Sequence, residues 1–245
     1  MDFQNKYILC KARGGSHAYG LQTAQSDIDY RGVFINTDVS HLFGLKKDEV
    51  LTTQNEKTDE VFTELRHAFK LLRSANTQMI ELLYMQDWEI ISPQWEHVQR
   101  FANHLIDSQK LLTSLLGYMR GELLLANGTR TGKLGGKRKE AVDRFGFSPK
   151  NFCQLLRLAW AGKIYFEKGH FPVNIPNYDL DFADVLFDIK TRPEKYTCNE
   201  LNARVTEAEA ALKLAYENRK YTTIFDEDVV DVLCYQTYLP FIQKL

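Results

Sequence analysis

The fold of this chain depends on the sequence Gly14-Gly15-Ser16-His17-Ala18-Tyr19-Gly20, which is followed by Ser26-Asp27-Ile28-Asp29-Tyr30-Arg31-Gly32-Val33. The preceding segment, Tyr7-Ile8-Leu9-Cys10, is apolar and predicts a short strand. Glycines allow a sharp backbone turn that brings N–H groups against a bound anion. The first half of the stretch therefore predicts a phosphate-binding turn.

The second half supplies the opposite charge. Alternate residues of a strand point to the same face, so Asp27 and Asp29 are expected to place two carboxylates side by side. Two such anions repel each other unless a proton or a cation stabilises them. Hard oxygen ligands favour Mg²⁺ or Mn²⁺. A phosphate-binding turn beside a metal-binding carboxylate pair is suited to phosphoryl transfer.

Gly-Ser, a short gap and Asp-x-Asp resemble the signature of the DNA polymerase β-like nucleotidyltransferase superfamily. The longer run from Gly14 to Phe34 is similar to its bacterial and phage nucleotidyltransferase branch. The resemblance implies an α+β fold with a catalytic core of mixed sheet and helices, and transfer of a nucleoside monophosphate from an NTP to an acceptor hydroxyl. This is a reaction of the EC 2.7.7 type. The alternative is a glycine hairpin followed by a solvated acidic strand.

The resemblance also implies roles for individual residues. Gly15 and Ser16 are expected to hold the triphosphate, with Tyr19 in the same nucleotide-binding loop. Asp27 and Asp29 are expected to bind the divalent ions. For His17, bracing the turn is favoured over contact with a phosphate or base.

Superfamily members carry a third carboxylate on a later strand, and Asp59 is the candidate for this catalytic and metal-binding position. A strand within residues 50–58 is expected to deliver it near the strand's end, before a helix that begins at Glu64-Leu65. Glu60 is the second choice. The alternative for Asp59 is a residue that only favours the positive end of that helix.

A second block resembles the family pattern Gly-x-Asp-x-Lys…His-x-x-Arg-Leu. Ser148 and Pro149 predict a helix start, and Lys150 and Arg157 follow as candidate contacts to the triphosphate or the acceptor. Ser148 and Gln154 depart from the family pattern, since they stand near the usual Asp and His. The alternative is that Lys150 and Arg157 are ordinary surface charges.

The chain is expected to divide at Ser92-Pro93, which favours a break or a helix start. Residues 1–92 are expected to form the catalytic core, and residues 93–245 a helical domain that covers the cleft. The loop 127–139 is rich in glycine and cations, but its spacing does not match a P-loop. A basic loop that touches phosphates and an ordinary loop between helices both remain open.

Composition narrows the function class. The 245 residues carry a formal net charge of −1, which argues against a protein dedicated to coating nucleic acid. The four cysteines are scattered and have no zinc or dithiol spacing. No apolar run reaches the ~20 residues needed to cross a bilayer, so we expect a cytoplasmic protein without a membrane partner.

The sequence leaves the acceptor open between a nucleic-acid end, a protein side chain and a small molecule. It also leaves open the base preference of the NTP and the oligomeric state. Two rival hypotheses are a non-catalytic nucleotide-sensing module and an antitoxin-type protein that binds a partner.

Overall fold

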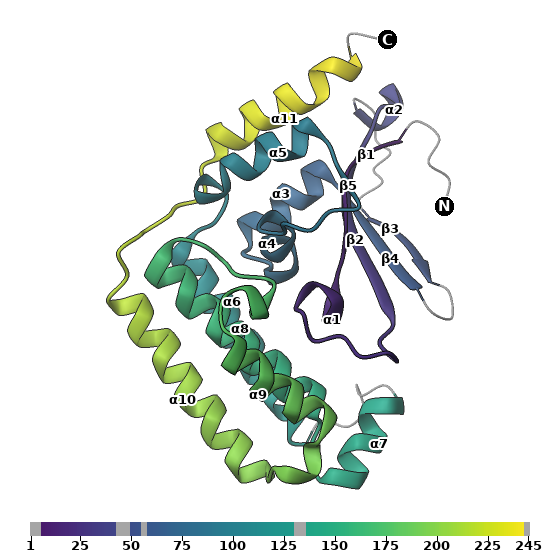
Figure 1. Cartoon of the computed structure of the whole chain (residues 1–245). Helices are drawn as coiled ribbons and strands as arrows, with labels where there is room; N and C mark the ends of the chain where they lie inside the picture. Colours follow the sequence, from purple (N-terminus) through teal and green to yellow (C-terminus); the bar gives the residue numbers. More distant parts are fainter. Residues whose placement is uncertain (1–5, 43–49, 55–57, 130–135, 243–245) are drawn as a thin grey trace. The chain divides into compact units, whose positions relative to one another are not determined.

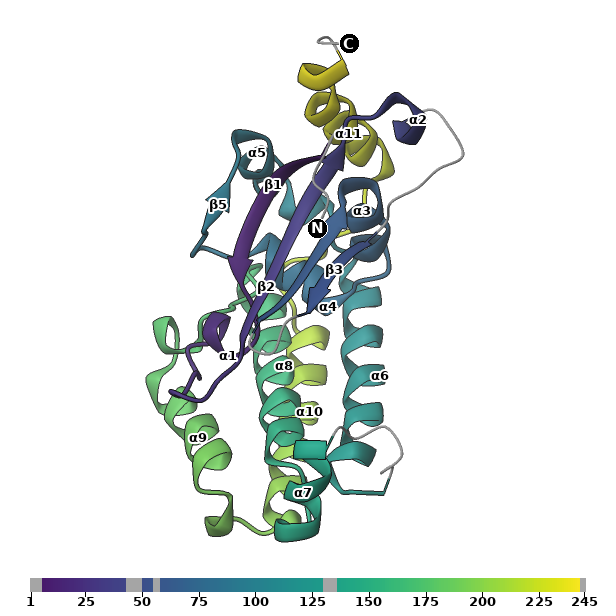
Figure 2. The same ribbon diagram turned by 90° about the vertical axis from the view of Figure 1, so that its right-hand side faces the viewer.

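The computed structural model describes the chain except for residues 1–5, 43–49, 55–57, 130–135 and 243–245. In the described residues, five strands form one mixed sheet in the order β3-β4-β2-β1-β5. The strands are β1 (Lys6–Arg13), β2 (Ile28–Asn36), β3 (Val50–Gln54), β4 (Thr58–Glu64) and β5 (Ile90–Ile91). β2 and β4 are parallel, and the other neighbouring pairs are antiparallel (Figure 2). The predicted α+β fold is confirmed.

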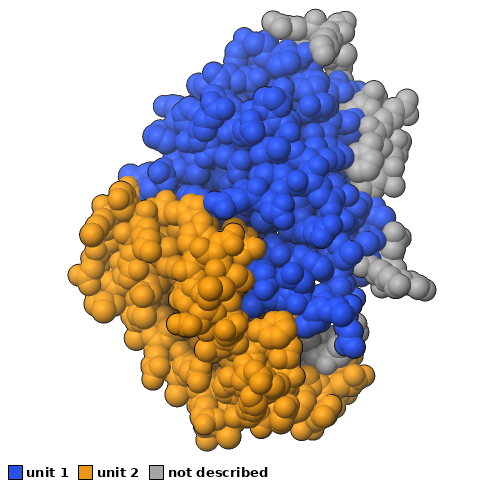
Figure 3. Space-filling model, in the orientation of Figure 1, with its two compact units in different colours: residues 1–107, 223–245 blue, residues 108–222 orange. Residues whose placement is uncertain are grey.

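The chain packs into two compact units, which Figure 3 colours separately. Unit 1 comprises residues 1–107 and 223–245, and unit 2 comprises residues 108–222. Unit 1 contains the sheet and α1 (Gly15–Ala18), α2 (Val39–Leu42), α3 (Leu65–Arg73), α4 (Thr77–Leu83), α5 (Pro93–Arg100) and α11 (Glu227–Ile242). Within this unit, α3, α4, α5 and α11 lie along one face of the sheet (Figure 1).

Local sequence explains where these helices begin. Glu64 caps α3 by accepting hydrogen bonds from the backbone N–H groups of Arg66 and His67. Ser92 caps α5 in the same way, with Pro93 at the first helical position. The helix starts predicted at residues 64–65 and 92–93 are both confirmed. The buried side of α3 follows the helical repeat and consists of Leu65, Ala68, Phe69 and Leu72.

Unit 2 is helical, with α6 (Ser108–Ala126), α7 (Gly136–Phe145), α8 (Pro149–Lys168), α9 (Leu180–Thr191) and α10 (Cys198–Glu217). Gly162 lets α8 pack closely between its neighbours, because a Cβ there would lie 2.5 Å from Leu115 Cδ1 of α6 and 2.9 Å from Leu212 Cδ1 of α10. The predicted start of α8 at Ser148-Pro149 is confirmed. Residues 136–139 of the basic segment begin α7, and residues 130–135 lie outside the described part.

The position of Asp59 and Glu60 within the strands differs from the sequence expectation. Asp59 and Glu60 lie near the start of the separate strand β4, not at the end of one strand over residues 50–58. The expectation treated β3 and β4 as one strand, whereas they are two strands that pair antiparallel.

The predicted boundary at Ser92-Pro93 falls inside unit 1, to which both α5 and α11 belong. The chain returns to this unit at its C-terminal end, where the Tyr238 hydroxyl donates to the buried Glu64 carboxylate. His97 of α5 also bonds Gln236 of α11 at 2.8 Å. The covering of the cleft by a helical domain stays a prediction.

Among the helices that the structure describes, none combines the length and the apolar character needed to cross a lipid bilayer.

Candidate active site

The Gly-Ser turn sits directly on the first acidic strand. The backbone N–H of Gly14 donates to the carbonyl oxygen of Asp29 over 2.8 Å. Gly15 has a φ of +58°, and a Cβ built there would lie 2.3 Å from Oδ2 of Asp29. Only glycine combines this left-handed backbone with so close an approach. The turn that opens α1 is therefore fitted against the Asp29 carboxylate.

The sheet brings Asp29 and Asp59 to the same face. They are register partners in the parallel pair β2 and β4. Such partners project their side chains to the same side of a sheet. Asp27 lies just before β2 and is exposed. Of the three predicted carboxylates, the structure thus pairs two across neighbouring strands and places the third at the strand's entrance.

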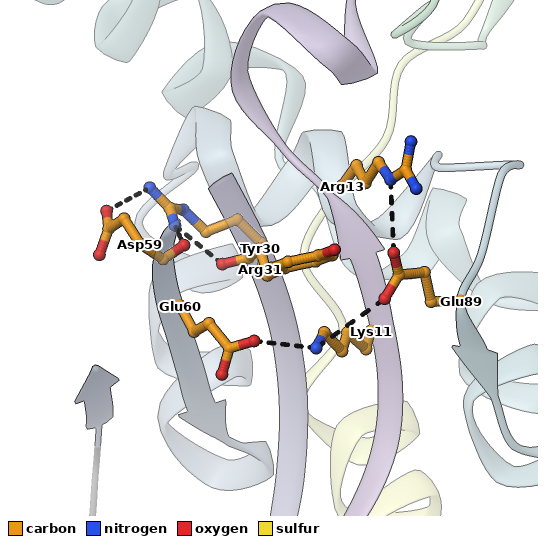
Figure 4. A network of polar contacts seen from close by, with 7 residues as sticks. All are labelled: Lys11, Arg13, Tyr30, Arg31, Asp59, Glu60 and Glu89. Carbon is orange, nitrogen blue, oxygen red and sulfur yellow. Dashed lines mark hydrogen bonds and ion pairs between the residues drawn. The ribbon is translucent and has the colours of Figure 1, made fainter. Parts of the chain in front are cut away.

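Arg31 lies two residues beyond Asp29 on the same face of β2 and contacts Asp59 (Figure 4). Its Nη2 atom is 3.3 Å from Oδ2 of Asp59. Its Nη1 atom donates to the carbonyl oxygens of Tyr30 at 2.8 Å and of Asp59 at 3.4 Å. The carboxylate predicted to complete the site therefore already has a cationic neighbour, which the sequence reasoning did not anticipate.

Glu60 belongs to a different network on the opposite face (Figure 4). Its carboxylate is 2.9 Å from Lys11 Nζ, and that ammonium also lies 3.8 Å from Glu89 and 4.0 Å from the centre of the Tyr30 ring. Arg13 Nε contacts Glu89 at 3.3 Å. Of the two candidates for the third carboxylate, Asp59 shares the face of Asp29 and Glu60 does not.

Tyr19 and His17 follow the turn and face inward. The Tyr19 hydroxyl donates to Oε2 of Glu81 over 2.8 Å. Glu81 is a buried carboxylate of α4 whose role the sequence left undecided. One signal was visible, because a lone acid within the apolar run of residues 79–83 needs a polar partner if it is buried. In the described structure, Nε2 of His17 is buried without a hydrogen-bond partner.

Lys150 and Arg157 both lie on α8, which belongs to unit 2. Lys150 is exposed, whereas the Arg157 side chain is fully enclosed at 1% exposure. The Arg157 Nε atom donates to Oε1 of Gln154 at 3.2 Å. Their roles as triphosphate or acceptor contacts stay predictions.

The chemistry of the acidic face fits a divalent ion such as Mg²⁺ or Mn²⁺. Asp29 and Asp59 present hard oxygen donors on one face, with Asp27 close in sequence. Among the described residues, no group of three or more His, Cys, Asp or Glu side chains is gathered for a metal ion. Asp27, Asp29 and Asp59 are the residues that would hold such an ion.

Comparison with known proteins identifies the family. The family model described as RNA repair pathway DNA polymerase beta family matches residues 3–172. The match includes the whole sheet, the Gly-Ser turn and α8 with Lys150 and Arg157. A search of curated proteins gave no match. Because the matched segment covers more than half of the chain, the chain belongs to the RNA repair pathway DNA polymerase beta family, which indicates a nucleotidyltransferase-type role.

Proposed function

We propose that the protein is a nucleotidyltransferase that uses Mg²⁺ or Mn²⁺ to move a nucleoside monophosphate from an NTP to an acceptor hydroxyl. The observation that carries the proposal is the close approach of Gly15 to Asp29, whose register partner Asp59 lies on the same face. This arrangement joins a phosphate-binding turn to a pair of carboxylates. Family membership supports the same class of reaction.

In the proposed reaction, the acceptor oxygen attacks the α-phosphorus of the NTP and forms a new P–O bond. The bond to the β-phosphate breaks, and pyrophosphate leaves. When bound, the divalent ions neutralise the triphosphate and the departing pyrophosphate. The turn at Gly15 and Ser16 orients the triphosphate, and Asp27, Asp29 and Asp59 would hold the ions.

Asp59 is proposed to orient the acceptor hydroxyl and accept its proton. The Arg31 guanidinium beside it partly balances the negative charge of this carboxylate, since opposite charges at this distance attract. The register of β4 on β2 places this proposed proton acceptor on the same face as Asp29.

For the acceptor, we propose an RNA end. The support is the description of the matching family, which names an RNA repair pathway. A protein side chain or a small molecule remains an outcome of the test.

The test compares the purified protein with Asp29→Asn and with the double variant Asp27→Asn/Asp29→Asn. Each is incubated with every α-labelled NTP in turn, with Mg²⁺ or Mn²⁺, and with RNA carrying a free 3′-hydroxyl. RNA blocked by a 3′-phosphate is the negative control, and single-stranded DNA and a protein extract are the alternative acceptors. We expect the native protein to label RNA that carries a free 3′-hydroxyl, and we expect neither variant to do so. Equal labelling by the double variant would contradict the proposal.

Nucleotide sensing is the second candidate, because Arg31 already balances the charge of Asp59. A sensor needs no free third carboxylate. Metal-dependent NTP binding with no transfer to any acceptor would favour this reading. A small protein that co-purifies with the chain would instead support the partner-binding hypothesis.

A further inference from the structure

A hydrogen bond links the nucleotide loop to a distant helix of unit 1. The Tyr19 hydroxyl donates over 2.8 Å to Oε2 of Glu81, a residue 62 positions later in α4. Glu81 is only 6% exposed. A buried carboxylate is costly unless its oxygens accept hydrogen bonds. The tyrosine hydroxyl therefore helps keep this carboxylate inside the unit.

The Glu81 end of the bond is fixed. Asn76 caps α4 by accepting a 3.1 Å bond from the N–H of Met79. At its other end, Gln99 of α5 donates to the carbonyl oxygens of Leu83 at 2.8 Å and Met85 at 3.1 Å. Every residue of α4 except Gln78 is buried. The helix that carries Glu81 is thus held along its whole length.

The Tyr19 end has little stability of its own. α1 has four residues, and a helix of that length does not persist without outside contacts. Gly15, its first residue, and Gly20, two residues after its end, have positive φ angles of 58° and 72°. On the N-terminal side, the turn is held by the bond from Gly14 N–H to the Asp29 carbonyl. On the C-terminal side, it is held by the bond from the Tyr19 hydroxyl to Glu81.

We propose that Glu81 is a positioning residue that holds the Gly15–Ser16 turn in place through the Tyr19 hydroxyl. Glu81 acts on the loop and does not touch the substrate. The assignment rests on the proposed function, in which this turn orients the triphosphate. Loss of the bond lets the C-terminal side of the turn move away from its place over Asp29, which weakens binding of the NTP.

Three variants and one control test the link. Tyr19→Phe removes the donor and keeps the ring. Glu81→Leu removes the acceptor and suits the apolar surroundings, while Glu81→Gln retains an acceptor oxygen. The control is Tyr84→Phe, which removes a tyrosine hydroxyl at the end of α4 that bonds Asn103 at 3.5 Å.

We expect Tyr19→Phe and Glu81→Leu each to raise the KM for NTP about tenfold, the size of effect given by a hydrogen bond to a charged group. We expect kcat to change less than about twofold, because binding to the turn serves ground and transition states alike. The double variant should be no worse than either single variant, since both remove the same bond. Glu81→Gln should recover part of the loss.

Amide hydrogen exchange gives a readout that needs no catalysis. The N–H groups of Tyr19 and Leu21 donate to the carbonyl oxygens of Gly15 and Ser16 at 3.2 and 2.9 Å, so they report on the closed turn. Their exchange should become about tenfold faster in Tyr19→Phe and Glu81→Leu, and stay unchanged in the control.

The two readouts separate the positioning role from the reaction. The proposal is overturned if Tyr19→Phe has the same KM and the same exchange rates as Tyr84→Phe. It is also overturned if the increases in KM of the two single variants add in the double variant. If the native protein transfers no nucleotide, the proposed function fails, and exchange then decides alone. In that case, faster exchange confined to the Tyr19 and Glu81 variants supports the positioning role of Glu81, and unchanged exchange overturns it.

Discussion

The two faces of the sheet at the start of β4 carry the same kinds of charge in different settings. On one face, Asp59 pairs with Arg31 and lies beside Asp29 in register. On the other, Glu60 pairs with Lys11. Side-chain exposure hardly separates the two acids, at 33% for Asp59 and 26% for Glu60.

What separates them is the position of the Gly-Ser turn. Gly15 approaches the Asp29 carboxylate and so lies on the Asp59 side. Adjacent residues of a strand point to opposite faces. Asp59 therefore lies on the side of the turn, and the next residue, Glu60, lies in an ion-pair network on the other side. Charge alone does not mark a site here. The strand register and the neighbouring backbone do.

The largest expected effect comes from removing the charge at the centre of the acidic face. Asp29→Asn keeps the side-chain shape but weakens the binding of a divalent ion. We expect nucleotidyl transfer to fall about a thousandfold or more, as happens when a main electrostatic group is lost. Steady-state labelling of RNA measures the loss, and a circular dichroism melt checks that the fold is kept. Activity within tenfold of native would remove the basis for distinguishing the two faces.

The close contact between the turn and Asp29 gives the next effect. Gly15→Ala places a Cβ 2.3 Å from Asp29 Oδ2 at a φ of +58°. We expect about a hundredfold loss of transfer, and about 1–2 kcal/mol loss of stability from the left-handed backbone.

Gly146→Ala is the matched control, since Gly146 has a φ of +79° and a Cβ at that position would meet open space. It should carry the backbone cost and keep activity. Urea unfolding and the transfer assay together separate the two effects. Equal activity in the two variants would show that the contact with Asp29 is unimportant.

Much of this site follows from sequence, for physical reasons. The glycines and the alternating Asp27 and Asp29 report on local geometry, which short stretches determine. The helix starts at Glu64-Leu65 and Ser92-Pro93 could also be predicted, because a capping side chain bonds N–H groups only two or three residues further along the chain. These predictions depend on neighbours in the chain.

Contacts between distant segments were not readable. Choosing Asp59 over Glu60 by geometry requires the register of β4 on β2. That register pairs Asp29 with Asp59, two residues that lie 30 positions apart in the sequence. The Arg31–Asp59 contact depends on the same register. The bond from Tyr19 to Glu81 joins a loop to a helix and leaves only the trace of an acid in an apolar run.

A smaller effect is expected from removing the cations that pair with the two acids, Arg31 beside Asp59 and Lys11 beside Glu60. Arg31→Met removes the cation beside Asp59 and should raise the affinity for Mn²⁺ about two- to fivefold, the worth of a partly exposed ion pair. Lys11→Met does the same to Glu60 on the other face and should leave Mn²⁺ affinity unchanged. Electron paramagnetic resonance of free Mn²⁺ measures both without catalysis. Equal gains in the two variants would mean that the faces do not differ in cation binding.

The smallest expected effect is at Glu60 itself. Glu60→Gln loses the ion pair with Lys11, and we expect a stability change within about 1 kcal/mol because the pair is partly solvated. Transfer should stay within about twofold of native, since its side chain faces away from Asp29 and surface changes of this kind are small. Asp59→Asn, assayed in parallel, should lose transfer by at least about a hundredfold. If instead Glu60→Gln is the inactive variant and Asp59→Asn the active one, the third carboxylate lies on the other face and the register argument fails.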